Sequence, residues 1–146
     1  MGWNVYEDYI MRQIRNLVKA LLHIIGLREA GELQAARQEI GKVYRQLFGD
    51  DGRLSLYLDS KTGAELLGHP EKMTVMADLL HEEAEIMRAG NEGDPRDMDR
   101  CALEYALEAF IAAPQSEENA TRIKRLAKYV SREALDVRYR QIFEKF

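Results

Sequence analysis

The sequence predicts an all-α fold, in which antiparallel helical hairpins stack as an α-solenoid or bundle of about six helices. Apolar residues recur every three or four positions along most of the 146 residues, as on the buried faces of helices. Three prolines and ten glycines are few, which favours long helices over a strand-rich sandwich. The length fits one domain, residues 1–146, with a helix pair over about 5–48, a linker over 49–69 and helices over about 70–146.

The first predicted helix, from about Val5 to Arg28, contains the most apolar stretch of the chain. A signal peptide needs a basic head, but Glu7 and Asp8 stand at that position. A membrane span needs about 20 nearly uninterrupted apolar residues, and here bases and a histidine interrupt the run. The apolar residues share one helical face: Ile10, Ile14, Leu17, Val18, Leu21 and Ile25. We therefore expect a core-facing helix of a cytoplasmic protein, with attachment to a membrane surface as the less favoured alternative.

The second predicted helix begins after Gly31 and covers about residues 32–48. Its apolar residues form a narrow seam: Leu33, Ala36, Ile40, Val43 and Leu47. Because the break at Gly31 is short, its partner is the first helix, packed antiparallel. Gly41 costs up to about 1 kcal/mol relative to alanine inside a helix, so we expect a close backbone approach there. A turn over residues 49–52 and a short helix near residues 61–67 follow.

Two long helices are expected next. The first begins at His69–Pro70 and has this inner stripe: Met73, Met76, Leu80, Ala84 and Met87. The second is capped by Asp94–Pro95. Its polar residues fall on one narrow arc: Asp97, Arg100, Glu104 and Glu108. Because the other sides of this helix are apolar or small, it should be covered on most sides and lie in the middle of the domain.

The last helical segment follows Pro114 and is capped by Ser116. Its inward residues are Ile123, Leu126, Ala127 and Val130. The apolar stripe then jumps to Leu135, Tyr139, Ile142 and Phe143, which predicts a bend near Ser131.

Two segments resemble the second half of a tetratricopeptide repeat: the spacing Gly31, Ala36, Ile40, Val43, and "YALEAFIAAP" with Ala106, Phe110 and Ala113. The first half of that consensus precedes neither segment, so the predicted α-solenoid or bundle is tetratricopeptide-like, with no repeat count. The stretches "DYIMRQI", "GELQAARQEIGKVYRQLFG", "MADLLHEEAEI" and "YALEAFIAA" are similar to an uncharacterised family of Gram-positive bacterial proteins, defined as a domain of unknown function.

This family resemblance covers most of the chain, and residues 8–12 are its most specific part. It implies an all-helical, repeat-like fold and brings no known activity. Similar proteins continue beyond the position of Phe146, so either this member is short or the chain is a truncated version. In the second case Ile142, Phe143 and Phe146 would lack cover.

No catalytic, cofactor or metal motif stands out. Asp78 and His81 give one acid-x-x-His spacing, whereas di-iron bundles use a pair of Glu-x-x-His motifs. His81 and Glu85 lie one turn apart, which is more typical of a solvated pair than of a metal site. The single cysteine, Cys101, excludes an internal disulfide, indicates a reducing compartment and lies on an apolar arc. We therefore expect neither enzymatic activity nor a cofactor, and keep a metal-dependent enzyme as the third hypothesis.

The net charge of −4 is unevenly distributed: residues 71–115 carry net −7 and residues 116–146 net +3. The favoured interpretation is that the basic last segment packs beside the acidic middle one. The alternative is a nucleic-acid-binding regulator that uses a basic strip on the 116–132 helix: Arg122, Lys124, Arg125, Lys128 and Arg132. The chain is acidic overall and has no recognisable docking motif, so nucleic acid is the less expected partner.

The sequence does not identify a biological process. The first hypothesis is a cytoplasmic protein–protein interaction or scaffold module, because stacked hairpins leave a groove for a peptide or a partner helix. Aromatic residues and arginine are favoured at binding surfaces, and the candidates for the rim of such a groove are Tyr6, Tyr9, Arg12 and Tyr44. The alternative is that the same tyrosines close the core. Self-association as a homodimer is the first partnership expected, because a truncated solenoid leaves its end faces uncovered.

Overall fold

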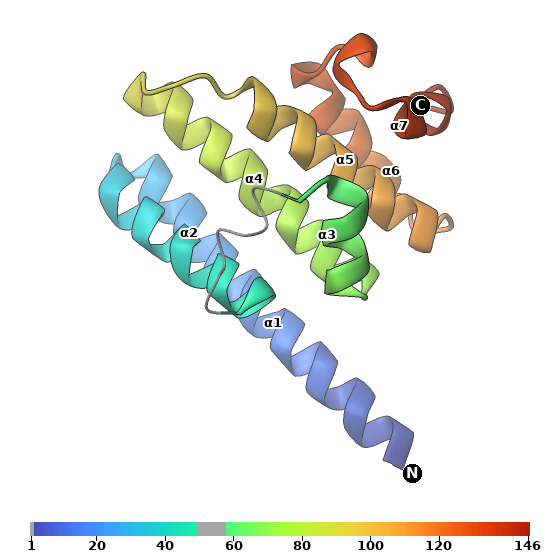
Figure 1. The fold of residues 1–146 in the computed structure, drawn as a ribbon. Helices are drawn as coiled ribbons and strands as arrows, with labels where there is room; N and C mark the ends of the chain where they lie inside the picture. Colours follow the sequence, from blue (N-terminus) through green and yellow to red (C-terminus); the bar gives the residue numbers. More distant parts are fainter. Residues whose placement is uncertain (1, 50–57) are drawn as a thin grey trace.

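The computed structural model describes the backbone of residues 2–49 and 58–146, with side chains from Val5 onward. Within these residues the chain is all-helical, which confirms the predicted fold class (Figure 1). The α-helices are α1 (Gly2–Glu29), α2 (Leu33–Phe48), α3 (Ser60–Leu67), α4 (Pro70–Gly90), α5 (Arg96–Ala112), α6 (Glu117–Leu126) and α7 (Val137–Phe143). Two 3₁₀ turns, η2 (Ala127–Tyr129) and η3 (Arg132–Ala134), join α6 to α7. The turn expected over residues 49–52 lies, beyond Gly49, outside the described residues.

The α1–α2 hairpin forms as predicted. Gly31 has a φ of +78°, and its N–H donates to Arg28 O over 3.0 Å, which ends α1 in a left-handed turn. Along α2, Ala36, Ile40 and Val43 are buried, and α2 runs beside the C-terminal half of α1 while the N-terminal half extends away from the other helices (Figure 1). None of the described helices is long and apolar enough to cross a membrane.

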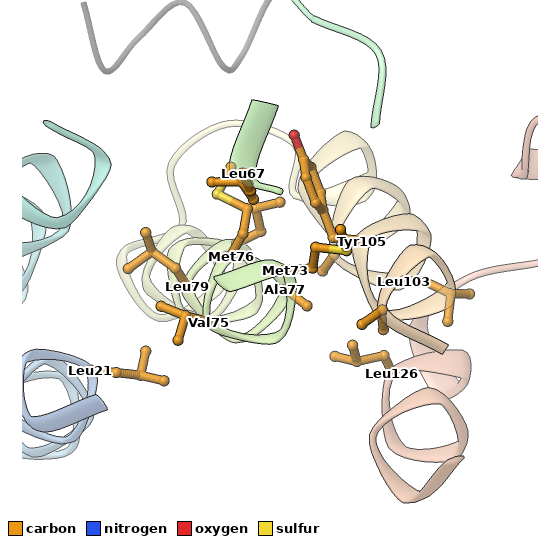
Figure 2. Close-up of a cluster of buried hydrophobic side chains, with 14 of the residues drawn as sticks. Leu21, Leu67, Met73, Val75, Met76, Ala77, Leu79, Leu103, Tyr105 and Leu126 are labelled. Carbon is orange, nitrogen blue, oxygen red and sulfur yellow. The ribbon is translucent and has the colours of Figure 1, made fainter. Parts of the chain in front are cut away.

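The expectation of a close backbone approach at Gly41 was wrong. A Cβ at that position would meet only the Nη1 of Arg45, at an ordinary 3.6 Å. The close approach occurs at Gly63 of α3, where a Cβ would lie 1.8 Å from the Oη of Tyr105 in α5. The Tyr105 ring rises from α5 beside Leu67 of α3 (Figure 2).

Helix α4 lies at the centre of the domain and packs against α1, α2, α3 and α5. Four residues of the predicted inner stripe are buried and the fifth, Met87, is half-buried. The stripe was too narrow, because a second side of α4 is also buried and contains Val75, Leu79 and Ile86. Figure 2 shows Val75 and Leu79 on the side of α4 away from Tyr105, and Met73 and Ala77 on the side toward it. The extra buried side receives the α1–α2 hairpin, which the sequence pattern of α4 alone does not reveal.

Helix α5 is covered as predicted, with every residue from Ala102 to Ala109 buried. Two residues of its polar arc, Glu104 and Glu108, are buried as well. Helix α3 and the segment around α7 cover them: Ser60 Oγ donates to Glu104 over 2.9 Å, and Tyr139 Oη donates to Glu108 over 3.0 Å. The polar arc of α5 therefore forms hydrogen bonds that hold α3 and α7 against α5.

The C-terminal segment bends as predicted. Ser116 Oγ caps α6 by accepting from Asn119 N–H over 3.2 Å, and the chain turns through η2 and η3 on either side of Ser131. Leu135 and Tyr139 are buried. Three residues expected to lack cover in a truncated chain are partly buried against the core: Ile142, Phe143 and Phe146. The Phe146 ring packs edge-on against Phe110 at 4.9 Å between centroids.

Candidate functional site

A groove of about 400 Å³ lies between α1 and α6, with α4 as its floor. We call it the α1–α6 groove. Val75 and Leu21 lie at its base and are buried, whereas the groove itself opens between the two flanking helices. Figure 2, in which α4 is seen nearly end-on, shows Leu21 of α1 and Leu126 of α6 on opposite sides of Val75 and Ala77.

The wall that α1 contributes is apolar and open. Val18, Leu22 and Ile25 line it at helical steps of four and three. Leu22 is 62% exposed and Val18 is 40% exposed. The buried seam of α1 is a different stripe that includes Leu17 and Leu21. The assignment of Val18 to the core-facing stripe was therefore wrong, because α6 does not approach closely enough to cover that edge of α1.

The opposite wall is polar and acidic. Asp78 of α4 accepts from Arg122 Nε over 3.0 Å and from Arg125 Nη2 over 2.9 Å, which bridges the floor to α6. Glu71 and Glu118 line the groove in the first turns of α4 and α6 and are exposed. The two walls thus differ in chemistry: one presents aliphatic side chains and the other presents charge.

The predicted rim residues do not line this groove. Tyr6 and Tyr9 are 68% and 60% exposed on the N-terminal half of α1, where Arg12 is also exposed. Tyr44 is buried in α2, and its hydroxyl donates to Glu83 of α4. Burial is the main cause that raises the pKa of Tyr44 well above its ordinary value. The structure therefore groups three of the candidates on one projecting helix and places the fourth in the core.

The predicted basic strip is largely engaged within the chain. Arg122 and Arg125 bind Asp78, and Arg132 forms an ion pair with Glu144. Lys124 and Lys128 are exposed. The pairs to Asp78 agree with the interpretation that the basic last segment packs on the acidic middle one, and they reduce the charge that a phosphate backbone would meet.

Several buried carboxylates belong to polar contacts between helices rather than to the groove. Glu82 of α4 accepts from Arg28 Nε of α1 over 2.5 Å, and this bond raises the pKa of Arg28. Glu108 accepts from Arg138 over 2.9 and 3.1 Å, and burial raises the pKa of the neighbouring Tyr139. Glu104 accepts from Asp136 N–H over 3.2 Å. Each carboxylate has a partner on another segment, which is how folded proteins accommodate buried charge.

Arg88, in the last turn of α4, joins three elements. Its Nη1 and Nη2 donate to the two carboxylate oxygens of Asp99 in α5, over 2.8 and 3.0 Å. The same side chain donates to Glu85 and lies 4.7 Å from the ring centroid of Tyr129 in η2. The hydrogen bond with Asp99 is the main cause that raises the pKa of Arg88. This arrangement fixes the α4–α5 hairpin and seats η2 on it.

No group of three or more metal-ligating side chains converges among the described residues. His81 lies against Tyr129, with 5.3 Å between ring centroids, and its buried Nδ1 makes no hydrogen bond with any described residue. Burial is the main cause that lowers the pKa of His81. Burial also raises the pKa of the Cys101 thiol, which leaves little of the reactive thiolate at neutral pH.

His81 should make the protein less stable in mild acid. Its pKa is lowered in the folded state, so between that value and the ordinary pKa of about 6.5 the unfolded chain binds more protons. We expect the free energy of unfolding to be fully retained above about pH 6.5 and to fall as the pH drops below it. In His81→Gln this fall should be smaller. Urea unfolding at pH 7.5, 6.5 and 5.5 measures it, with exposed His23→Gln as the control; equal slopes in wild type and His81→Gln would contradict the prediction.

Comparison of the chain with known proteins gave no match to a family model, to a curated protein or to a solved structure. Its function is therefore inferred from the geometry of the groove.

Sequence reasoning missed Leu22, Glu71 and Glu118 as groove residues. One signal was present: Leu22 lies outside the core seam, yet it continues the apolar line of Val18 and Ile25.

Proposed function

We propose that the protein is a protein–protein interaction module whose α1–α6 groove binds a helix or peptide of a partner. The observation that carries the proposal is the apolar wall of Val18, Leu22 and Ile25 beside an open groove of about 400 Å³. Leucine exposed to 62% at the edge of a groove is the arrangement by which helical grooves receive the apolar face of an amphipathic segment.

The dimensions of the wall support a helical occupant. Val18 to Ile25 covers seven residue steps, about 10 Å at 1.5 Å per residue, which matches two turns of a partner helix. Two turns present anchors at steps of three and four, the same spacing as the wall.

A cytoplasmic location is part of this proposal, because the only cysteine of the chain is an unpaired thiol.

Leu22→Asp tests the proposal, because it places a charge on the apolar wall without opening the core. Leu66→Asp is the matched control, since Leu66 is 63% exposed on α3 and does not line the groove. We expect wild type and Leu66→Asp to retain the same partner from a lysate of the source organism, and Leu22→Asp to lose it.

Calorimetry with the purified partner should then show affinity at least about 30-fold weaker for Leu22→Asp, as at a hot-spot position. Circular dichroism establishes that both variants fold. A partner bound equally by wild type and Leu22→Asp would show that the groove is not the binding site.

A further inference from the structure

We infer that the segment bound in the α1–α6 groove is a basic amphipathic helix, apolar toward α1 and bearing lysine or arginine toward α4 and α6. This inference rests on the proposed function and specifies the partner. It follows from the different chemistry of the two walls, which an occupant lying between them must match on its two sides.

The charge inside the groove is negative. Among the described residues that line it, the acids are Glu71, Asp78 and Glu118, and the only base is Arg122. Arg122 is held by Asp78 over 3.0 Å, and the same carboxylate holds Arg125. Glu71 and Glu118 line the groove and are exposed. An incoming base would therefore meet the exposed carboxylates of Glu71 and Glu118, whereas an incoming acid would be repelled by them.

Three other sources of charge lie near the groove. Arg125 does not line it and is bound to Asp78. The N-terminal ends of α4 and α6 each contribute roughly half a positive charge, less than the full negative charges of Glu71 and Glu118 beside them. Arg15 and Lys19 of α1 are exposed but do not line the groove. The aliphatic wall therefore favours an apolar side on the bound helix, and the acidic wall favours a basic side opposite it.

Two synthetic helical peptides with the same leucine face test the inference, one with lysine and one with glutamate at the polar positions. Fluorescence anisotropy with the full chain measures their affinities at low and at physiological salt. We expect the lysine peptide to bind about tenfold more tightly, an effect of the size that two exposed carboxylates supply. The advantage should shrink as salt screens the charges.

The variant Glu71→Gln/Glu118→Gln should abolish most of the preference for lysine. Its matched control, Glu32→Gln/Glu133→Gln, removes the same net charge from exposed positions outside the groove and should keep the preference. Glu71 and Glu118 lie in first helical turns, where an acid stabilises the helix. Thermal unfolding of each variant therefore measures whether the substitutions destabilise the protein. Leu22→Asp should lower the affinity for the lysine peptide as well, because the apolar side of the peptide packs against the wall that contains Leu22.

Equal affinity for the two peptides, tighter binding of the glutamate peptide, or binding of neither would overturn the inference. An unchanged affinity of the lysine peptide for Leu22→Asp would also overturn it, because such binding would be non-specific attraction to an acidic protein. A dimer that Leu22→Asp dissociates in light scattering would assign the groove to a second copy of the chain and overturn it too. Any of these results leaves the Leu22-dependent capture of a partner intact as a separate test of the proposed function.

Discussion

Arg88→Ala is expected to lower the free energy of unfolding by about 3 kcal/mol, the lower end of the range for breaking a buried ion pair. Asp99 is only 5% exposed and accepts two parallel hydrogen bonds from the Arg88 guanidinium. Removing the arginine leaves this carboxylate buried without its countercharge and removes the cation that lies over the Tyr129 ring. Urea denaturation followed by circular dichroism at 25 °C measures the change.

Three further variants separate charge from geometry. Arg88→Lys keeps the charge but cannot make both bonds of the fork, so its loss should be intermediate. Arg88→Leu/Asp99→Leu removes both charges together and should be more stable than Arg88→Ala, because no unpaired charge is left buried. Arg96→Ala is the surface control: its ion pair to Asp94 is exposed, and no measurable loss is expected. Equal stability of Arg88→Ala and Arg96→Ala would contradict the prediction.

Gly63→Ala is expected to destabilise the protein by about 2 kcal/mol, although alanine normally favours a helix. The new Cβ would lie 1.8 Å from the Oη and 2.9 Å from the Cζ of Tyr105. The Tyr105 ring is buried and cannot move aside without displacing its neighbours on α4 and α5. The same unfolding measurement detects the loss.

The partner position provides the internal check. Tyr105→Phe alone should be neutral or slightly stabilising, because the hydroxyl is buried and makes no hydrogen bond with any described residue. Gly63→Ala should cost less when it is combined with Tyr105→Phe, which leaves Cζ close, and nothing when it is combined with Tyr105→Leu. Gly26→Ala on α1, where a Cβ meets nothing within 4 Å, should stabilise by up to about 1 kcal/mol. A Gly63→Ala variant as stable as Gly26→Ala would refute the steric explanation.

The helices, the hairpins and the bend follow from local sequence signals. The seam of α2, the cap at Ser116 and the break at Gly31 act within a few residues, and the structure contains all three. What depends on distant segments was not predictable in the same way. The burial of Glu104 and Glu108 is one example, because their partners on α3 and around α7 lie 31 to 44 residues away in the chain.

The candidate site was less accessible to sequence reasoning than the fold. Periodicity assigns Val18 and Leu22 to faces of α1, but whether a face stays open depends on how far α6 lies from it. The groove combines residues of α1, α4 and α6. About 50 positions separate the groove residues of α1 from those of α4, and about 45 separate those of α4 from those of α6. Aromatic composition favoured Tyr44 as a surface residue, whereas its helix turns it into the core, where its hydroxyl meets Glu83.

The position of α4 between the α1–α2 hairpin and α5 has a consequence for how the molecule opens. Amide protons at the outer turns of α1 can exchange with solvent through local fraying, because that half of the helix extends away from the others (Figure 1). Those of α4 are shielded on two sides, so they become accessible only when the whole domain unfolds. The slowest-exchanging backbone should therefore be in the middle of the chain, and the fastest helical backbone at its beginning.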